Sequence, residues 1–247
     1  MEAISARGLK RSFGETLAVA GVDLDVAVGA VFGLLGPDGA GKSTLIRMLA
    51  TTLLPDSGDA EIFGISVVKD PKAVRPRIGY MSQRFSMYPD LTVRENMDFF
   101  AKIRGVDKQE RQTRGAKLLE SMGLAEFADR QAMHLSGGMK QKLMLATTLM
   151  HEPDLLLLDE PTTGVDPVSR REFWHILQGL HDEGKSVLVA TPYMDEAERC
   201  TDIAFLDSGR ITESGTPAQI KAKVPPGPEE PTMESAFIYL AEKREDG

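Results

Sequence analysis

One stretch of this chain has residue types and spacing suited to binding phosphate. It reads Gly-Pro-Asp-Gly-Ala-Gly-Lys-Ser-Thr and follows the P-loop pattern G-x-x-x-x-G-K-[ST]. Glycines let the backbone curl so that successive N–H groups point inward at phosphate oxygens. Lys42 can reach the β- and γ-phosphates, and the Ser43 hydroxyl can ligate Mg²⁺. We therefore predict a nucleotide-binding loop made of Gly36, Pro37, Asp38, Gly39, Ala40, Gly41, Lys42, Ser43 and Thr44.

A second candidate is an acidic pair at the end of an apolar run. Leu155–Leu158 precede Asp159 and Glu160, which predicts a buried strand with its carboxylates at the carboxyl edge of a sheet, where ligands bind. Phosphoryl transfer needs an acid that holds Mg²⁺, which suits Asp159. It also needs a group that orients or deprotonates water, which suits Glu160. Alone, the pair is equally typical of a strand that ends at a solvated turn. Its interpretation as part of a nucleotide site therefore depends on the P-loop.

A third candidate is Ser136-Gly137-Gly138, which directly precedes a predicted helix. Its hydroxyl, its free N–H groups and the helix N-terminus form a second anion-binding surface. One nucleotide rarely needs two such surfaces from one chain. Two copies arranged head-to-tail would use both, each completing the site of the other across a symmetric interface.

These residues need strands and helices to position them, and the apolar pattern predicts both. Residues 31–35 form a strand before the P-loop, and a helix follows it with apolar residues at helical spacing. Thr92 and Glu95 form a capping box that opens another helix, which ends at Gly105. Further helices are expected at 108–122, 136–150, 168–180, 195–199, 217–222 and 233–240. Further strands are expected at 3–6, 22–26, 78–81, 155–159, 187–190 and 203–206, with edge strands at 60–64 and 210–213.

The alternation of strands and helices predicts an α/β fold with a mainly parallel sheet, interrupted by a helical block. The 247 residues, 42% of them hydrophobic and 27% charged, suit a globular protein with a large core. A net charge of −8 argues against a general nucleic-acid surface, and the single Cys200 is expected to be a small buried side chain. We see neither a secretory signal nor an 18-residue apolar span, so a separate protein would have to cross the membrane.

In order along residues 1–220, these motifs resemble those of the nucleotide-binding subunits of ATP-binding-cassette (ABC) transporters. By this resemblance, 36–44 is the Walker A loop, 155–160 the Walker B strand, 135–141 the signature sequence and 163–166 the D-loop. Gln83 falls where the family's glutamine touches Mg²⁺ and senses the membrane partner. Phe13 falls where an aromatic ring stacks on adenine, although alone it would equally be a turn or core aromatic. The resemblance also implies a P-loop NTPase core, an N-terminal antiparallel β subdomain and an inserted helical subdomain.

Two residues depart from the family pattern. Asp38 stands where Asn is frequent, and we expect its carboxylate to point away from the triphosphate. Pro192 stands where the family has a histidine that bonds the γ-phosphate, and proline offers neither a side-chain donor nor an N–H. It is also an ordinary residue at the end of a strand. We therefore expect ATP and Mg²⁺ to bind and hydrolysis at this chain's own site to be weak.

The resemblance predicts an ATP-binding and hydrolysing motor subunit of an exporter for drugs, antibiotics or lipids. Its expected partners are a second cassette, in a homodimer or as one half of a tandem or heterodimeric pair, and an integral membrane permease, with no nucleic acid. It would act in the cytoplasm, on the inner face of the cell membrane. Residues 1–220 would be the ATPase domain, with the helical subdomain at about 84–150, and residues 221–247 a Pro-rich linker and an amphipathic helix. Alternatives are a cassette that binds ATP as a switch, a soluble ABC ATPase of translation or DNA repair, and, less favoured, a P-loop kinase.

Overall fold

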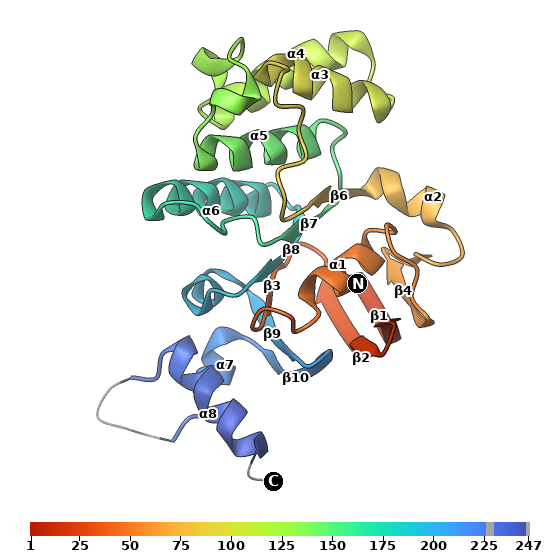
Figure 1. Ribbon diagram of the computed structural model, residues 1–247, viewed down its shortest axis with the longest axis vertical. Coiled ribbons are helices and arrows are strands. Elements are labelled where there is room, and N and C mark those ends of the chain that lie inside the picture. Colours follow the sequence, from red (N-terminus) through yellow and green to blue (C-terminus); the bar gives the residue numbers. More distant parts are fainter. Residues whose placement is uncertain (226–229, 246–247) are drawn as a thin grey trace.

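The computed structural model describes residues 1–225 and 230–245, and its centre is a six-stranded sheet (Figure 1). The strand order is β10-β9-β3-β8-β7-β6, and every neighbouring pair is parallel except β10 with β9. The mainly parallel sheet is therefore confirmed, with the predicted edge strand β10 at one side. Its strands are β3 (Val31–Leu35), β6 (Ile78–Met81), β7 (Leu155–Asp159), β8 (Ser186–Thr191), β9 (Asp202–Asp207) and β10 (Arg210–Gly215).

A second, four-stranded sheet is antiparallel and has the order β2-β1-β4-β5. Its strands are β1 (Glu2–Phe13), β2 (Thr16–Ala27), β4 (Ser57–Ile62) and β5 (Ile65–Ser66). The antiparallel N-terminal subdomain implied by the family resemblance is thus present.

Three strand predictions in this sheet were inaccurate. The hairpin strands β1 and β2 are each 12 residues long, far longer than the predicted 3–6 and 22–26. Their pairing contains several register shifts, which interrupt the apolar–polar alternation that marks a strand in the sequence. The strand predicted at 60–64 is present as β4, but its expected edge position was wrong, because β4 lies between β1 and β5. A half-buried strand shows the same alternation at the edge and in the middle of a sheet.

Both faces of the six-stranded sheet are covered. Leu155 and Leu157 of β7 pack in one cluster with helix α1 (Lys42–Leu49) and the antiparallel sheet. Leu156 and Leu158 point to the opposite face and pack with α5 (Gly137–Leu149) and α6 (Pro167–Asp182). Because both faces of β7 are buried, its leucine run is continuous. Asp159 ends this run at the sheet edge.

The helical block lies at one end of the molecule, beyond α6 (Figure 1). It contains α3 (Val93–Ile103), α4 (Lys108–Ser121), α5 and two short 3-10 turns, η2 (Ala125–Phe127) and η3 (Ala132–His134). The predicted capping box is present, since Thr92 accepts from the Glu95 N–H and the Glu95 carboxylate accepts from the Thr92 N–H. The Ser136 side chain caps α5 by accepting from the Met139 N–H.

The remaining elements flank the sheet. They are α2 (Pro71–Val74), η1 (Arg75–Arg77), η4 (Met194–Arg199), α7 (Pro217–Lys221) and α8 (Met233–Glu245). Helix α8 buries Met233, Ala236 and Leu240 in the same cluster as α5 and α6, and it contacts η4. Of the Pro-rich linker predicted at 225–231, residues 226–229 lie outside the described residues.

Candidate nucleotide site

The P-loop connects β3 to α1 and contains two glycines at which an added side chain would clash with neighbouring backbone. A Cβ atom on Gly36 would lie 2.1 Å from the Leu206 carbonyl oxygen. A Cβ atom on Gly41 would lie 2.2 Å from the Ala18 carbonyl oxygen, and the Gly41 φ of +107° is already in the region that favours glycine. The loop therefore passes close to two neighbouring backbones before α1 begins at Lys42.

Lys42 is the buried cation of this loop, with 3% of its surface exposed. Its Nζ donates to the carbonyl oxygens of Gly36 and Pro37 at 2.9 and 3.0 Å. It also lies 3.3 Å from Oε1 of Glu160, which is itself 6% exposed. A buried ammonium needs such partners, because an unpaired charge away from water is strongly unfavourable.

The two carboxylates at the end of β7 have separate partners. Asp159 Oδ1 accepts from the Ser43 hydroxyl at 2.9 Å. Glu160 Oε2 accepts from Gln83 Nε2 at 2.8 Å and from the Thr163 hydroxyl at 3.3 Å. Residues that lie far apart in the chain are thus brought together as the motifs predicted. Thr163 was expected only as part of the D-loop, and its contact with Glu160 was not predicted.

Burial and charge shape the protonation of this cluster. Burial raises the pKa of Asp159, and the neighbouring Glu160 raises it further, while the Ser43 hydrogen bond and Lys42 lower it in part. Burial, followed by the charge of Asp159, raises the pKa of the Tyr80 hydroxyl to about 12. No described ion pair joins Asp159 to a cation, since the ammonium of Lys42 lies against Glu160.

Other predicted site residues lie apart from this cluster. Ser136 and Gly137 are exposed at the start of α5, and Gly138 packs so closely on Ser169 of α6 that an added Cβ would lie 2.5 Å from the Ser169 Cβ. No described hydrogen bond or ion pair joins these three residues to the P-loop. Phe13 is 45% exposed beside the β1–β2 turn, under the guanidinium of Arg11 at 5.1 Å.

The exposed side chain of Asp38 makes no hydrogen bond or ion pair among the described residues. Its exposure is consistent with the expectation that the carboxylate points outward.

The loop after β8 contains Pro192 and is held by an unpredicted network. The guanidinium of Arg170 lies 4.1 Å from the ring centroid of Tyr193, and its Nε lies 3.9 Å from Glu196. Glu196 is 1% exposed and accepts from the Thr162 hydroxyl at 2.6 Å. Within the described residues, none of the four histidines makes a hydrogen bond or ion pair to this loop.

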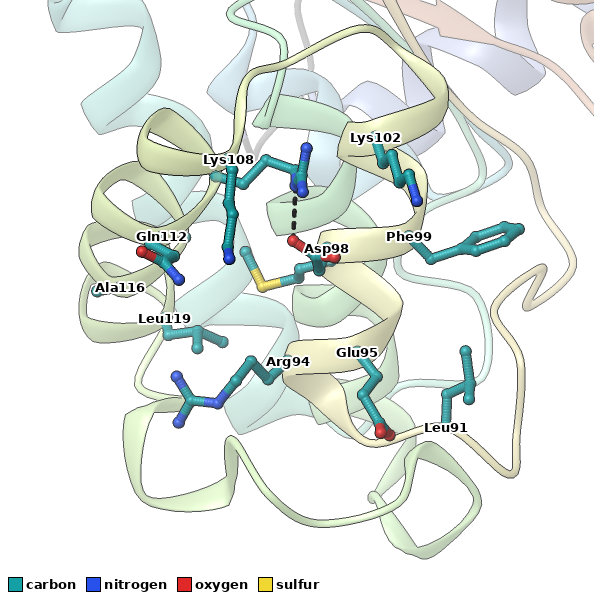
Figure 2. A pocket seen from close by; sticks show the side chains of 13 residues that line it. Leu91, Arg94, Glu95, Asp98, Phe99, Lys102, Lys108, Gln112, Ala116 and Leu119 are labelled. Carbon is teal, nitrogen blue, oxygen red and sulfur yellow. Dashed lines mark hydrogen bonds and ion pairs between the residues drawn. The ribbon is translucent and has the colours of Figure 1, made fainter.

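A groove lies away from the cluster, between α3 and α4 of the helical block, with a volume of about 770 Å³ (Figure 2). Arg111 of α4 and Asp98 of α3 form an ion pair of 2.6 Å across it. Phe99 projects from α3 away from α4 and forms an edge-on contact with Tyr88, with ring centroids 4.9 Å apart. Tyr88 and Phe99 are 48% and 37% exposed, so this end of the molecule presents apolar rings to solvent.

The fold and the cluster together define an α/β nucleotide-binding protein of the P-loop class, since a Lys-Ser pair at a helix start faces two acids at the end of a parallel strand. A family model described as "ABC transporter" matches residues 19–163. The chain belongs to this family.

Named relatives share most of this chain. It is 42% identical over 238 residues to the probable multidrug ABC transporter ATP-binding protein YbhF of Escherichia coli (strain K12), covering 96% of this chain and 41% of YbhF. It is 44% identical over 223 residues to the daunorubicin/doxorubicin resistance ATP-binding protein DrrA of Streptomyces peucetius, covering 90% of this chain and 68% of DrrA. The chain thus spans well under two thirds of one relative and about two thirds of the other.

Among solved structures, a dimeric bacterial ABC transporter cassette superposes with a TM-score of 0.79 at 27% identity, covering 86% of this chain and 98% of that one. This similarity confirms the ABC ATPase fold. No helix within the described residues is both long and apolar enough to cross a membrane.

Proposed function

We propose that this chain is the ATP-binding and hydrolysing motor subunit of an ABC exporter and powers transport through a separate membrane subunit. The observation that carries the proposal is the buried cluster in which Lys42 contacts Glu160 and Ser43 contacts Asp159, at the start of α1. The relatives named above are a multidrug transporter subunit and a drug resistance protein, which favours an exporter over an ATPase of translation or DNA repair.

In this proposal, the P-loop N–H groups and Lys42 bind the ATP phosphates. Lys42 would exchange its contact with Glu160 for the incoming phosphate oxygens, because these carry more negative charge. Glu160, still held by Gln83 and Thr163, would then be free to accept a proton from the attacking water. Phe13, exposed at the β1–β2 turn, would stack on the adenine ring.

The residues present fit a magnesium ion that is bound together with ATP. Mg²⁺ prefers oxygen ligands and commonly takes one or two carboxylates together with substrate phosphates. Asp159 and Ser43 offer such oxygens, with the Gln83 amide as the third proposed ligand. Within residues 1–225 and 230–245, no three His, Cys, Asp or Glu side chains form a metal site of their own. When bound, the ion would neutralise charge on the phosphates.

We further propose that a second cassette completes each site with Ser136, Gly137 and Gly138. The exposure of Ser136 and Gly137 leaves them accessible to another molecule, and their separation from this chain's own P-loop argues for use across an interface. One chain carries both halves, so a second copy of it is the simplest partner.

The exposed rings of Tyr88 and Phe99 suit contact with a membrane permease, which would hold the chain at the cytoplasmic face of the membrane.

Pro192 is the basis of a prediction about turnover. Because proline cannot donate a hydrogen bond to the γ-phosphate, we expect slow ATP hydrolysis by the wild-type protein and at least a tenfold faster rate in Pro192→His. Steady-state phosphate release measures this, with Pro192→Ala as the control that restores an N–H without adding an imidazole. Glu160→Gln should abolish turnover in either background. Brisk wild-type turnover that histidine does not raise would contradict the assigned role of position 192.

A further inference from the structure

A small pocket of about 450 Å³ lies where the core meets the helical block. Its walls come from α2 and η1, from the end of α3 and the start of α4, and from the loop between α5 and β7. None of the nucleotide-site residues lines it. Four cations line it: Lys72, Arg75, Arg104 and Arg114. Ile103 and His151 lie beside them, and we call this site the arginine pocket.

The acids that line the arginine pocket already have a partner. Glu152 lies 2.8 Å and Glu110 3.7 Å from the Arg114 guanidinium, which also donates to the Met150 carbonyl. Arg114 is therefore neutralised, and neither carboxylate pairs with another described cation.

The other three cations have no carboxylate partner among the described residues. Arg75 donates only to the Thr51 hydroxyl, at 3.1 Å, and Arg104 only to the Arg75 carbonyl oxygen, at 3.3 Å. Lys72 is exposed and makes no described hydrogen bond or ion pair. The chain as a whole has a net charge of −8, so three cations without a carboxylate partner around one pocket form a local region of positive charge.

Two groups that line the arginine pocket have pKa values that are lowered chiefly by desolvation and, in smaller part, by nearby cations. Desolvation of part of the Arg104 side chain lowers its pKa, and the charge of Arg75 lowers it further. Burial lowers the pKa of His151, and Arg104, Arg114 and Lys185 add to that effect against a hydrogen bond to Ile78 that raises it. His151 Nε2 lies 2.9 Å from the Ile78 carbonyl oxygen, and its buried Nδ1 has no partner within the described residues. An anion in the pocket would relieve this repulsion.

Exposed apolar surface borders the arginine pocket. Ile103, on the pocket wall, is 66% exposed. Cations beside exposed apolar side chains are the combination that binds the headgroup layer of an anionic membrane.

We propose that the arginine pocket binds the phosphate group of an anionic ligand. Arg75 and Arg104 offer forked donors that match phosphate oxygens, and Lys72 adds a point charge at the rim. A phosphate held there would bridge η1 of the core and the end of α3, and so fasten the helical block to the sheet. The same chemistry suits a phospholipid headgroup and a free phosphate compound.

The test uses the full chain saturated with MgADP, so that the nucleotide site is filled. One arm measures co-sedimentation with phosphatidylglycerol vesicles against phosphatidylcholine vesicles, and the other titrates glycerol phosphate by calorimetry. We expect binding in at least one arm and a loss of about fivefold for each cation removed by Lys72→Gln, Arg104→Gln or the Arg75→Gln/Arg104→Gln pair. Lys117→Gln and Arg171→Gln, exposed cations outside the pocket without a described partner, should bind as the wild type does.

The outcomes separate the two sources of phosphate. Vesicle binding that the pocket variants lose identifies a headgroup, whereas glycerol phosphate binding alone identifies a free phosphate compound. Lys72 is exposed and makes no described hydrogen bond or ion pair, so we expect Lys72→Gln to stay folded, and equal urea unfolding of this variant and the wild type checks that. Absence of binding in both arms, or equal losses in pocket and control variants, would overturn the proposal. These binding measurements do not test ATP hydrolysis, because hydrolysis depends on other residues.

Discussion

The geometry around Lys42 depends on backbone that only glycine can form, and this sets the cost of single substitutions. Gly41→Ala places a Cβ 2.2 Å from the Ala18 carbonyl oxygen at a φ of +107°. We expect it to lower the free energy of unfolding by about 3 kcal/mol or more and to impair ATP binding. Gly39→Ala is the matched control, because its φ is +81° but nothing lies within 4 Å of the added Cβ, and about 1 kcal/mol is expected. Urea unfolding without nucleotide compares the two, and equal losses would show that the close backbone approach is unimportant.

A buried carboxylate behind the loop after β8 leads to a second prediction. The Thr162 hydroxyl makes the only described hydrogen bond to the Glu196 carboxylate, at 2.6 Å, and both residues are 1% exposed. Thr162→Val keeps the shape but removes this donor, so we expect a loss of about 2–4 kcal/mol in urea unfolding. The double variant Thr162→Val/Glu196→Met removes both partners and should recover much of that loss. A change below about 0.5 kcal/mol in Thr162→Val would contradict this account.

Between secondary-structure elements, His151 ties the loop after α5 to β6 through the Ile78 carbonyl oxygen. The pKa of His151 is lowered in the folded protein, chiefly by burial, so the unfolded chain binds a proton more readily. Its contribution to stability is therefore present above the unfolded pKa of about 6.5 and is lost as pH falls below it. We expect the free energy of unfolding of the wild type to fall more steeply than that of His151→Asn between pH 7.5 and 5.5. Parallel curves would contradict the assigned environment.

Sequence alone predicted best the elements that are determined by residues close together in the chain. Strands β3, β6 and β7 and the capping box at Thr92 follow from short apolar runs and adjacent side chains, and they were predicted at or near their observed bounds. The inner position of β4 and the length of the β1–β2 hairpin follow from pairing with distant strands and from bulges, which leave no local pattern.

The same distinction holds for the candidate site. Lys42, Ser43, Asp159 and Glu160 were predicted because motif spacing reflects the chemistry of phosphate, whereas Gln83 was expected only from the family resemblance. The ion pair between Lys42 and Glu160, and the network of Arg170, Tyr193 and Glu196, depend on how strands and helices pack in three dimensions. Composition could not show that Glu196 is buried, because it lies in a charged run with exposed neighbours.

The molecule as a whole carries its motifs on two separate surfaces. The P-loop cluster lies at the carboxyl end of the central strands, and the exposed Ser136 and Gly137 lie at the start of α5. The proposed function treats these two places as half-sites and requires that a second copy of the chain join them around ATP. This requirement is the central claim of the account.

The most direct test is the molecular mass of Glu160→Gln in solution with and without MgATP, since this variant should bind ATP without hydrolysing it. We expect one chain without nucleotide and twice that mass with MgATP, measured by light scattering after size exclusion. Adding Lys42→Ala should prevent both ATP binding and pairing, whereas adding Ser136→Glu should prevent pairing alone. A Glu160→Gln protein that binds one ATP per chain and keeps the mass of a single chain would contradict the claim.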